Sequence, residues 1–559
     1  MSTVSRRTFV KGLAAGGAIA AFGDWRALAQ ARAPQAQSVL RGTSFDLSIG
    51  DTPMNFTGLT RPALAINGSI PGPVLRWREG DTVTLRVANR LAHEDTSIHW
   101  HGIILPADMD GVPGLSFHGI RPGETCTYRF DVRQSGTFWY HSHSGFQEQR
   151  GVYGPLIIEP HGDDSTRADR EHVILLSDWT DEDPARVYAK LKKQSTYYNY
   201  NKRTVGDFIR DARAQGLGAT LSDRAMWGEM RMNPTDLADV TGATYTHLMN
   251  GVTPNGNWTG LFRSGERVRL RIINGSAMTY FDVRIPGLKM TVVAADGLPV
   301  HPVTVDEFRI ATAETFDVIV EPSGQDAFTI FAQAMDRTAF AAGTLAVREG
   351  LRAPVPAPDP RPILSMNDMG HGDHAAHAGH TMPGMSTQQH SASESNPLVD
   401  MQTTMAMSKL DDPGIGLRDN GRRVLTYSDL GSTFPDPDGR EPGREIELHL
   451  TGHMEKFSWS FNGIKFSDAE PLQFTYGERL RIILVNDSMM THPIHLHGMW
   501  SDLENDAGDF MVRKHTIDMP PGSRRTYRVR ADAIGRWAYH CHLLFHMEAG
   551  MFREVRVSK

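Results

Sequence analysis

The chain has little of what marks several large classes of protein. Two of its 559 residues are cysteines, Cys126 and Cys541, which excludes a disulfide-rich scaffold. Lys and Arg number 58 against 65 Asp and Glu, and this balance gives no basic surplus for nucleic acid. The apolar run at residues 12–22 is too short to span a bilayer. We therefore expect no nucleic-acid partner and a mature protein that does not span a membrane.

The N-terminus reads SRRTFVKGLAAGGAIAAF, followed by the small residues of ALAQA. The paired Arg6 and Arg7 before a Gly/Ala-rich run resemble a twin-arginine signal peptide, which we assign to residues 1–31. This route carries folded proteins, often with their cofactor. The pattern therefore predicts that the twin-arginine export machinery is a partner and that the protein is periplasmic.

Three segments of the chain repeat one another. GDTVTLRVAN begins at Gly80, GERVRLRIIN at Gly265 and GERLRIILVN at Gly477, and each has the branched apolar residues of a β-strand. Their separations are domain-sized. Short strands, 53 Gly and 32 Pro favour antiparallel sandwiches. We expect an all-β protein with three copies of one domain.

A second repeat links the first and third copies alone. PGETCTYRFDVRQSGTFWYHSH (residues 122–143) matches PGSRRTYRVRADAIGRWAYHCH (residues 521–542). The middle copy has the strand-like ETFDVIVEP, but no His-x-His follows it. Ligand chemistry is therefore expected in the first and third domains, with a structural role for the middle one.

Two segments depart from the β pattern. Residues 183–216, DPARVYAK onwards, are expected to be partly helical. Residues 349–420 begin with APVPAPDPRP and continue with SMNDMGHGDHAAHAGHTMPGMSTQQH. Such Pro-rich and then His/Met-rich sequence is not expected to bury a core, and it predicts a mobile linker or insertion. We call residues 366–407 the His/Met segment.

The stretch HCHLLFHMEAGM, residues 540–551, concentrates metal ligands. Alternate side chains of a strand face opposite sides, so Cys541 points away from His540 and His542. A thiolate, two imidazoles and a distant thioether form a blue-copper site. His546 and Met551 supply two of these groups, and a second imidazole must come from elsewhere. The alternative is that Cys541 is a small buried hydrophobic residue.

Four His-x-His pairs complete the pattern. They lie in HWHG, WYHSH, HPIHLHG and HCH, two pairs in each of the repeat-related domains. A single pair could be two exposed histidines without a function, but this explanation accounts poorly for four pairs. The symmetry predicts that the eight histidines meet at an interdomain cleft, with His492 left to complete the Cys541 site.

These motifs, in this order, resemble the multicopper oxidase family over essentially the whole mature chain. The resemblance implies three cupredoxin-like Greek-key β-sandwich domains, at residues 38–162, 168–348 and 421–559, with the linker at 349–420. It also implies four copper ions and O2 as electron acceptor. The implied ligands are His492, Cys541, His546 and axial Met551 for type 1 copper, His99 and His495 for type 2 copper, and His101, His141 and His542 on one type 3 ion with His143, His497 and His540 on the other.

Two residues are implied to take part directly in catalysis. Cys541 is covalently flanked by two cluster ligands and so gives electrons a short path. Asp110, in DMDGVPG, matches an acidic residue that in relatives serves the type 2 copper and its bound water. The alternative for Asp110 is an Asp-Gly turn on the surface. Cys126 is interpreted as buried packing.

The His/Met segment indicates the electron donor, because thioethers prefer Cu(I). The periplasmic copper-tolerance branch of the family is the most similar, and we expect a monomer that oxidises Cu(I). The alternatives are a laccase-type oxidase of small phenols and aromatic amines, and a mainly copper-sequestering binding protein. The candidates for Cu(I) recruitment are Met366, Met369, His371, His374, His377, His380, Met382, Met385, Met489 and Met490.

Overall fold

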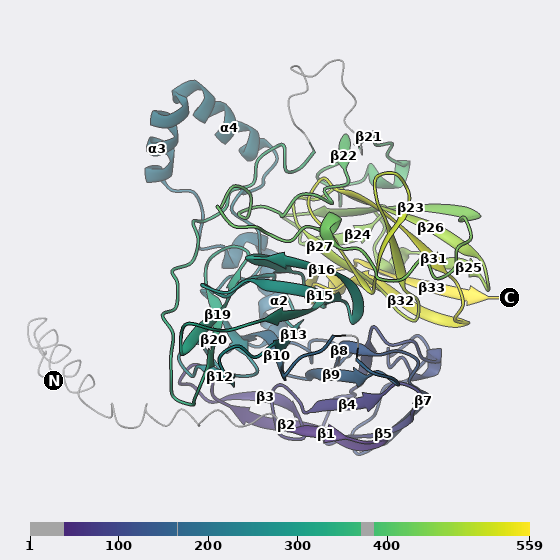
Figure 1. Ribbon diagram of the computed structural model, residues 1–559. Helices are drawn as coiled ribbons and strands as arrows, with labels where there is room; N and C mark the ends of the chain where they lie inside the picture. Colours follow the sequence, from purple (N-terminus) through teal and green to yellow (C-terminus); the bar gives the residue numbers. More distant parts are fainter. Residues whose placement is uncertain (1–37, 165, 371–384) are drawn as a thin grey trace, which may run out of the picture.

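The computed structural model describes residues 38–164, 166–370 and 385–559. The expected signal peptide and His371, His374, His377, His380 and Met382 lie outside these residues. The described chain forms three β-sandwich units, with the N-terminal unit at the bottom of the view in Figure 1 and the C-terminal unit at the upper right. Among the described helices, none has the length and apolar character needed to cross a membrane.

Each unit contains two sheets. In the first unit, one sheet has the order β1 (Val39–Arg41), β4 (Val74–Arg78), β9 (Tyr153–Glu159), β8 (Gly136–His141), β6 (His99–His101). The other has the order β3 (Arg61–Ile66), β2 (Ser44–Met54), β5 (Thr82–Asn89), β7 (Thr125–Asp131).

In the second unit, one sheet has the order β11 (Tyr245–Met249), β10 (Arg170–Thr180), β13 (Val268–Asn274), β18 (Thr315–Val320), β15 (Met290–Ala295), β16 (Leu298–Val305). The other has the order β12 (Trp258–Leu261), β20 (Phe340–Ala346), β19 (Ala327–Ala334), β14 (Phe281–Arg284), β17 (Glu307–Ile310).

In the third unit, one sheet has the order β24 (Ser458–Phe461), β23 (Arg444–His453), β26 (Arg479–Asn486), β31 (Arg524–Arg530), β28 (Ser501–Glu504), β29 (Phe510–Lys514). The other has the order β25 (Leu472–Thr475), β33 (Phe552–Ser558), β32 (Gly535–Cys541), β27 (His492–Leu496), β30 (Thr516–Met519). A separate two-stranded sheet joins β21 (Met385–Thr387) and β22 (Met405–Met407).

The three repeated sequences occupy the same place in the three units. They form β5, β13 and β26, each of which pairs in parallel with the strand before it in the sheet. The closing asparagines Asn89, Asn274 and Asn486 are buried, and each side-chain amide donates to two carbonyl oxygens of nearby loops. The repeat therefore encodes both a central strand and the anchor of the loop that follows it.

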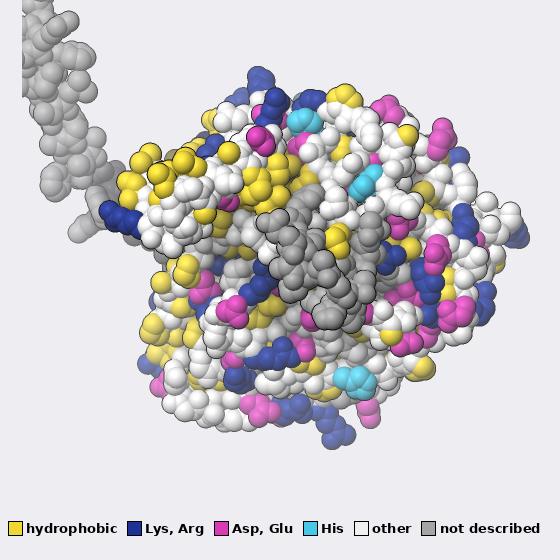
Figure 2. Space-filling view, turned by 90° about the horizontal axis from the view of Figure 1, so that it is seen from above, with side chains coloured by type: hydrophobic (Ala, Val, Ile, Leu, Met, Phe, Trp, Pro, Cys, Tyr) yellow, Lys and Arg dark blue, Asp and Glu magenta, His cyan; other side chains and the backbone are white. Residues whose placement is uncertain are grey.

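The helices interrupt the second unit and the end of the third. They are α2 (Pro184–Lys193), α3 (Val205–Gln215), α4 (Leu217–Glu229) and α5 (Leu544–Glu548). The expectation of partial helix over residues 183–216 is confirmed: Asp183 caps α2 at Ala185 N, and Thr204 forms a capping box with Asp207 at α3. Figure 2 shows hydrophobic side chains over the protruding α3 and α4, where Val205 and Leu217 are exposed.

The expectation that residues 349–420 bury no core is wrong for the described part. Leu364, Met369 and Leu417 are all buried. These scattered apolar residues build no core of their own, but the second and third units supply the other side of the contact. A few apolar side chains are enough to bury parts of the segment, because they pack against neighbouring domains that are already folded.

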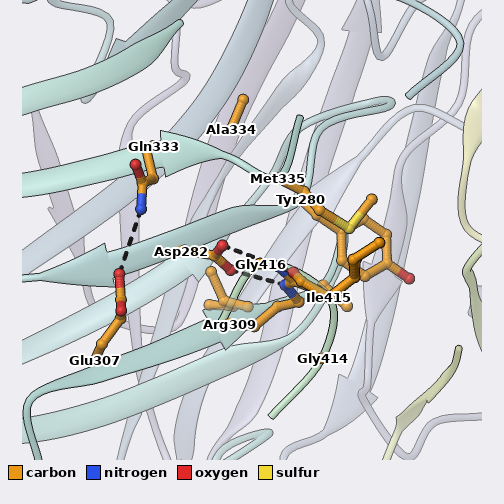
Figure 3. Close-up of polar contacts among 12 residues, drawn as sticks. Tyr280, Asp282, Glu307, Arg309, Gln333, Ala334, Met335, Gly414, Ile415 and Gly416 are labelled. Carbon is orange, nitrogen blue, oxygen red and sulfur yellow. Dashed lines mark hydrogen bonds and ion pairs between the residues drawn. The ribbon is translucent and has the colours of Figure 1, made fainter. Parts of the chain in front are cut away.

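A buried ion cluster ties the end of this segment to the second unit (Figure 3). Asp282 on β14 accepts from Arg309 at 2.7 Å and pairs with Arg337 at 2.6 Å. Burial raises the pKa of Asp282, but the two guanidinium groups outweigh it, and the net shift is downward. Arg309 also donates to the carbonyl of Ile415, and Arg337 to that of Gly416. One carboxylate thus positions two arginines that hold the passing chain.

Asp282→Asn should therefore lower the free energy of unfolding by about 3–5 kcal/mol, because it leaves buried guanidinium charge without a partner. The midpoint of urea unfolding, followed by tryptophan fluorescence, measures this change. Asp46→Asn is the control, since Asp46 pairs with Arg86 on the exposed surface and should leave the midpoint unchanged. Equal midpoints for the two variants would contradict the role given to Asp282.

Candidate metal centre

A first cluster surrounds the buried Cys541. Its sulfur lies 3.5 Å from Nδ1 of His492 and 3.9 Å from Nδ1 of His546, and these two nitrogens are 3.1 Å apart. Met551 is buried, and its carbonyl accepts from Cys541 N. The structure thus brings together the cysteine and both histidines expected of one site, and it places Met551 against the same strand.

The outer nitrogens of these two imidazoles are held by hydrogen bonds. Nε2 of His546 lies 2.8 Å from Oδ2 of Asp239, and Nε2 of His492 lies 2.7 Å from Oγ of Ser488. Because a carboxylate accepts the proton of His546 Nε2, the Nδ1 of His546 presents its lone pair to the sulfur. Burial raises the pKa of the Cys541 thiol, so a bound metal would be needed to hold it as thiolate.

A second cluster joins the first and third units through their eight paired histidines. The ligand nitrogens form three groups, within each of which they lie no more than 4.8 Å apart. The groups are His99 with His101 and His495, His101 with His141 and His542, and His143 with His497 and His540. We call these residues the eight-histidine cluster.

Strand pairing aligns the members of this cluster. β6 pairs with β8 so that His99 lies opposite His141, and β27 pairs with β32 so that His495 lies opposite His540. Cys541 lies opposite Ile494 in the same pairing. Since neighbouring side chains on β32 alternate between faces, this one strand contributes both to the Cys541 site and to the eight-histidine cluster.

Hydrogen bonds on the outer side fix the protonation of several cluster imidazoles. Nδ1 of His497 donates to Oδ2 of Asp110 at 2.8 Å, and Nδ1 of His540 donates to the carbonyl of Cys541 at 2.9 Å. Their Nε2 atoms are therefore lone-pair acceptors, yet they face one another at 3.0 Å. Two lone pairs at this distance repel unless a cation lies between or beside them.

The inner nitrogens of the other groups fit a metal in the same way. Nδ1 of His99 donates to the carbonyl of Asp110, and Nδ1 of His495 donates to that of His515. The buried Nε2 atoms of both have no hydrogen-bond partner, and neither does Nδ1 of His101. Such unpaired polar atoms are costly in a protein interior, and metal ligation accounts for them.

Burial keeps the cluster neutral and able to bind metal. It lowers the pKa of His101, His141, His495 and His497 well below the ordinary value, and neighbouring imidazoles lower it further. For His540 the pKa falls to about 4. The lone pairs are thus free for ligation at neutral pH.

Asp110 is a buried residue that reaches both halves of the cluster. It is 1% exposed, and it contacts His99 through its carbonyl and His497 through its carboxylate. The alternative of a surface Asp-Gly turn is therefore wrong. The alternatives of surface decoration for the histidines and of a purely packing role for Cys541 also disagree with these contacts.

Several residues at the site were missed by sequence reasoning. Oε2 of Glu148 lies 2.7 Å from Nδ1 of His141, which also lies 3.0 Å from the carbonyl of Ser142, and burial raises the pKa of Glu148 well above the ordinary value. Asp239 and Ser488 hold the imidazoles of the Cys541 site. Glu148 follows WYHSH closely, and this proximity was a usable signal, whereas Asp239 lies far from every motif in sequence.

The methionines named for Cu(I) recruitment differ in their surroundings. Met369, Met489 and Met490 are buried, and Met366 is half-buried. Met489 lines a cavity of about 70 Å³ between the second unit, the third unit and the 349–420 segment. Met490 lines a smaller one of about 10 Å³ that also contacts Asp239. Cys126, expected to be buried in packing, is half-buried on β7. Neither Cys126 nor the buried Cys541 forms a disulfide bond.

Comparison with known proteins identifies the relatives. Family models described as multicopper oxidase match residues 48–163, 170–349 and 439–559. The chain is 66% identical to a copper resistance protein A homolog of Pseudomonas syringae pathovar tomato over 99% of both chains, and 64% identical to copper resistance protein A of Escherichia coli over 99% of both chains.

Solved structures agree on the fold. A laccase from Botrytis aclada superposes with a TM-score of 0.62 at 22% identity, covering 93% of this chain and 88% of the laccase. The expected all-β class with three cupredoxin-like domains is confirmed.

His497→Ala should lower the copper content of the loaded protein by about one ion per chain, because it removes one of the three nitrogens that converge at its group. Mass spectrometry of total metal measures this loss. The exposed His118 of the first unit provides the matched control, His118→Ala, which should retain full copper content. Equal copper in the two variants would show that His497 does not hold metal.

Proposed function

The chain belongs to the multicopper oxidase family, and from this premise we propose that it oxidises Cu(I) to Cu(II) in the periplasm, with O2 as acceptor, as part of copper tolerance. When bound, the four copper ions of the family would supply one-electron oxidation of the donor and four-electron reduction of O2, so that four Cu(I), one O2 and four protons would yield four Cu(II) and two water molecules. Export by the twin-arginine route is part of the proposal, and the pattern around Arg6 and Arg7 supports it.

The clusters have room for the four copper ions of the family. We assign type 1 copper to His492, Cys541, His546 and Met551, type 2 copper to His99 and His495, and the type 3 pair to the two groups His101, His141, His542 and His143, His497, His540. The backbone of Cys541 joins it to His540 and His542, which gives electrons a continuous covalent path. Asp110 and Glu148 fix the tautomers of His497 and His141.

The space beside Asp239, the residue that contacts His546, bears on the choice of electron donor. The smaller cavity, lined by Asp239, Met335 and Met490, measures about 10 Å³, which is room for about one water molecule or ion and not for a phenol ring. Thioethers prefer Cu(I), and the Asp239 carboxylate contacts the imidazole of His546. Met335 also lines the larger cavity and lies beside Tyr280 and Ile415 (Figure 3). A space of this size that is lined by thioethers is suited to a bare ion.

The relatives support the same donor and leave one rival. The similar proteins of Pseudomonas syringae and Escherichia coli bear the name copper resistance protein A. The Botrytis aclada structure is that of a laccase, a name that keeps phenols as alternative donors. A copper-sequestering protein would not need Cys541 flanked by two cluster ligands. Cys541→Ser should therefore remove O2 consumption with either donor.

Met490→Leu combined with Met335→Leu should lower Cu(I)-dependent O2 consumption at limiting Cu(I) by about tenfold or more, since about 1.4 kcal/mol of lost Cu(I) binding gives that factor. An oxygen electrode measures the rate, and oxidation of a small phenol in the same samples should change little. Met290→Leu is the control, because Met290 is buried on β15 and lines neither cavity. An equal fall in the rates with Cu(I) and with the phenol would indicate a general defect of the enzyme and would contradict a role of these methionines in Cu(I) binding.

Replacing residues 371–384 with a Gly/Ser linker of equal length tests whether these residues recruit Cu(I). Met369 and Ala406 of the wider His/Met segment are buried, so deletion of the whole segment would disturb packing. We expect a selective fall in the Cu(I) rate at low Cu(I), with the phenol rate unchanged. Equal rates with Cu(I) would remove this stretch from the proposed function.

A further inference from the structure

A third cluster of possible metal ligands lies apart from the copper clusters. It consists of His390, Glu394, His449 and Asp487, whose ligand atoms all lie within 4.8 Å of one another. His449 is on β23, Asp487 follows β26, and His390 and Glu394 follow β21. Figure 1 shows β21 and β22 above β23 and β26. The cluster therefore joins the end of the His/Met segment to a sheet of the third unit.

The four side chains are withdrawn from solvent. Glu394, His449 and Asp487 are almost completely buried, whereas 15% of the His390 side chain is exposed. Nδ1 of His390 lies 2.9 Å from Oε2 of Glu394, and Nδ1 of His449 lies 2.7 Å from Oδ2 of Asp487. Each nitrogen also lies 3.5 Å from the carboxylate oxygen of the other pair. Two nitrogens and two oxygens thus converge on one point.

The far sides of both imidazoles are already occupied. Nε2 of His390 donates to the carbonyl of Thr403 at 2.9 Å, and Nε2 of His449 donates to Oε1 of Glu447 at 3.1 Å. Both acceptors lack a proton, so each imidazole must carry hydrogen on Nε2. A neutral imidazole then presents the lone pair of Nδ1 to a buried carboxylate oxygen, which is also an acceptor.

The remaining carboxylate oxygens are satisfied by other donors. Oδ1 of Asp487 accepts from Thr403 N at 2.9 Å, and Oε1 of Glu394 accepts from Oγ of Ser391 at 2.7 Å. Oδ2 of Asp487 and Oε2 of Glu394 are thus the atoms left to face the imidazoles. Four acceptors aimed at one another inside a protein require a cation.

Either protons or a metal ion can meet this requirement. Burial lowers the pKa of His449, but the carboxylates of Asp487 and Glu394 outweigh it and raise the value to about 9, which reflects the negative potential of the site. One divalent ion balances the charge of the two carboxylates, as two extra protons would, and it leaves both imidazoles neutral. The metal also satisfies all four acceptors at once.

We propose that His390, Glu394, His449 and Asp487 form a fifth metal site, which takes one divalent ion, best Cu(II), and fastens the end of the His/Met segment to the third unit. Two imidazoles with two carboxylates suit borderline divalent ions, and among these Cu(II) has the highest affinity for a given N/O site. Zn(II) is the next candidate from the same donor set. The partly exposed edge of His390 gives the ion a way in.

The site bears on the segment that leads to the type 1 ligands. Asp487 is followed by Ser488, whose hydroxyl contacts His492, and Thr403 bonds to Asp487 from the His/Met segment. A metal here cross-links three stretches that are far apart in sequence. It is a structural clamp, independent of which donor the enzyme oxidises.

His390→Gln and Glu394→Gln test the site in the full chain loaded with Cu(II). Each variant should bind one copper ion fewer per chain than the unaltered protein, with the blue absorption of the type 1 site unchanged as the sign of correct folding. His453→Gln is the matched control, because His453 lies on the same strand 3.5 Å from a single carboxylate, that of Asp400. This variant should bind as much copper as the unaltered protein. Equal copper in all four proteins would overturn the proposal.

Crystals of the unaltered chain give a test that needs no variant. Anomalous diffraction at the copper edge, after equilibration with Cu(II), should show a peak among the four side chains in addition to those of the four family copper ions. No peak there would mean that protons alone satisfy the cluster and would overturn the metal site. Failure of Cu(I) oxidation in solution would leave either result unaffected, so the clamp and the proposed function can be judged separately.

Discussion

The structure depends on one constraint, that lone-pair nitrogens of buried imidazoles face one another across the contact of the first and third units. Nε2 of His143 in the first unit lies 3.4 Å from Nε2 of His540 in the third, and Nε2 of His141 lies 3.4 Å from Nε2 of His542. Nδ1 of His540 donates to the carbonyl of Cys541, so Nε2 of His540 presents a lone pair to this contact. Without a cation, lone pairs at this point of the contact repel one another. A bound metal would make the same nitrogens ligands that join the two units.

The outer hydrogen bonds are what make this arrangement specific. Asp110, Glu148 and the carbonyl of Cys541 each accept a proton from one cluster imidazole, and so they decide which nitrogen faces inward. These partners come from a loop, a turn and a strand of two different units. The cluster is therefore a product of how the units dock, and a change in docking would change the tautomers as well as the distances.

The twofold periodicity of a strand links this cluster to electron entry. On β32, Cys541 faces the opposite side from His540, and the same alternation continues to His542. The loop that carries His492 is held by Asn486, whose amide bonds to the carbonyls of Met490 and Met519. The equivalent Asn89 holds the loop that leads to His99 of the eight-histidine cluster, whereas Asn274 of the second unit holds a loop that leads to none of the assigned copper ligands.

The sequence by itself determined the three-fold repeat, the strand character of its central segments, the ligand types and the special position of Cys541. These features are local or periodic, and a pattern of residues records them directly. The tertiary structure alone decided that Asp239 reaches His546, that Glu148 accepts from His141, and that Met369 is buried although its neighbours are polar. It also decided that His390 meets His449 and two carboxylates. Apart from Glu148 and His141, which are close in sequence, these contacts join residues from different domains or from distant segments of the chain. The physical reason is that burial and partner choice depend on which surfaces dock, and no short-range pattern in a chain encodes that.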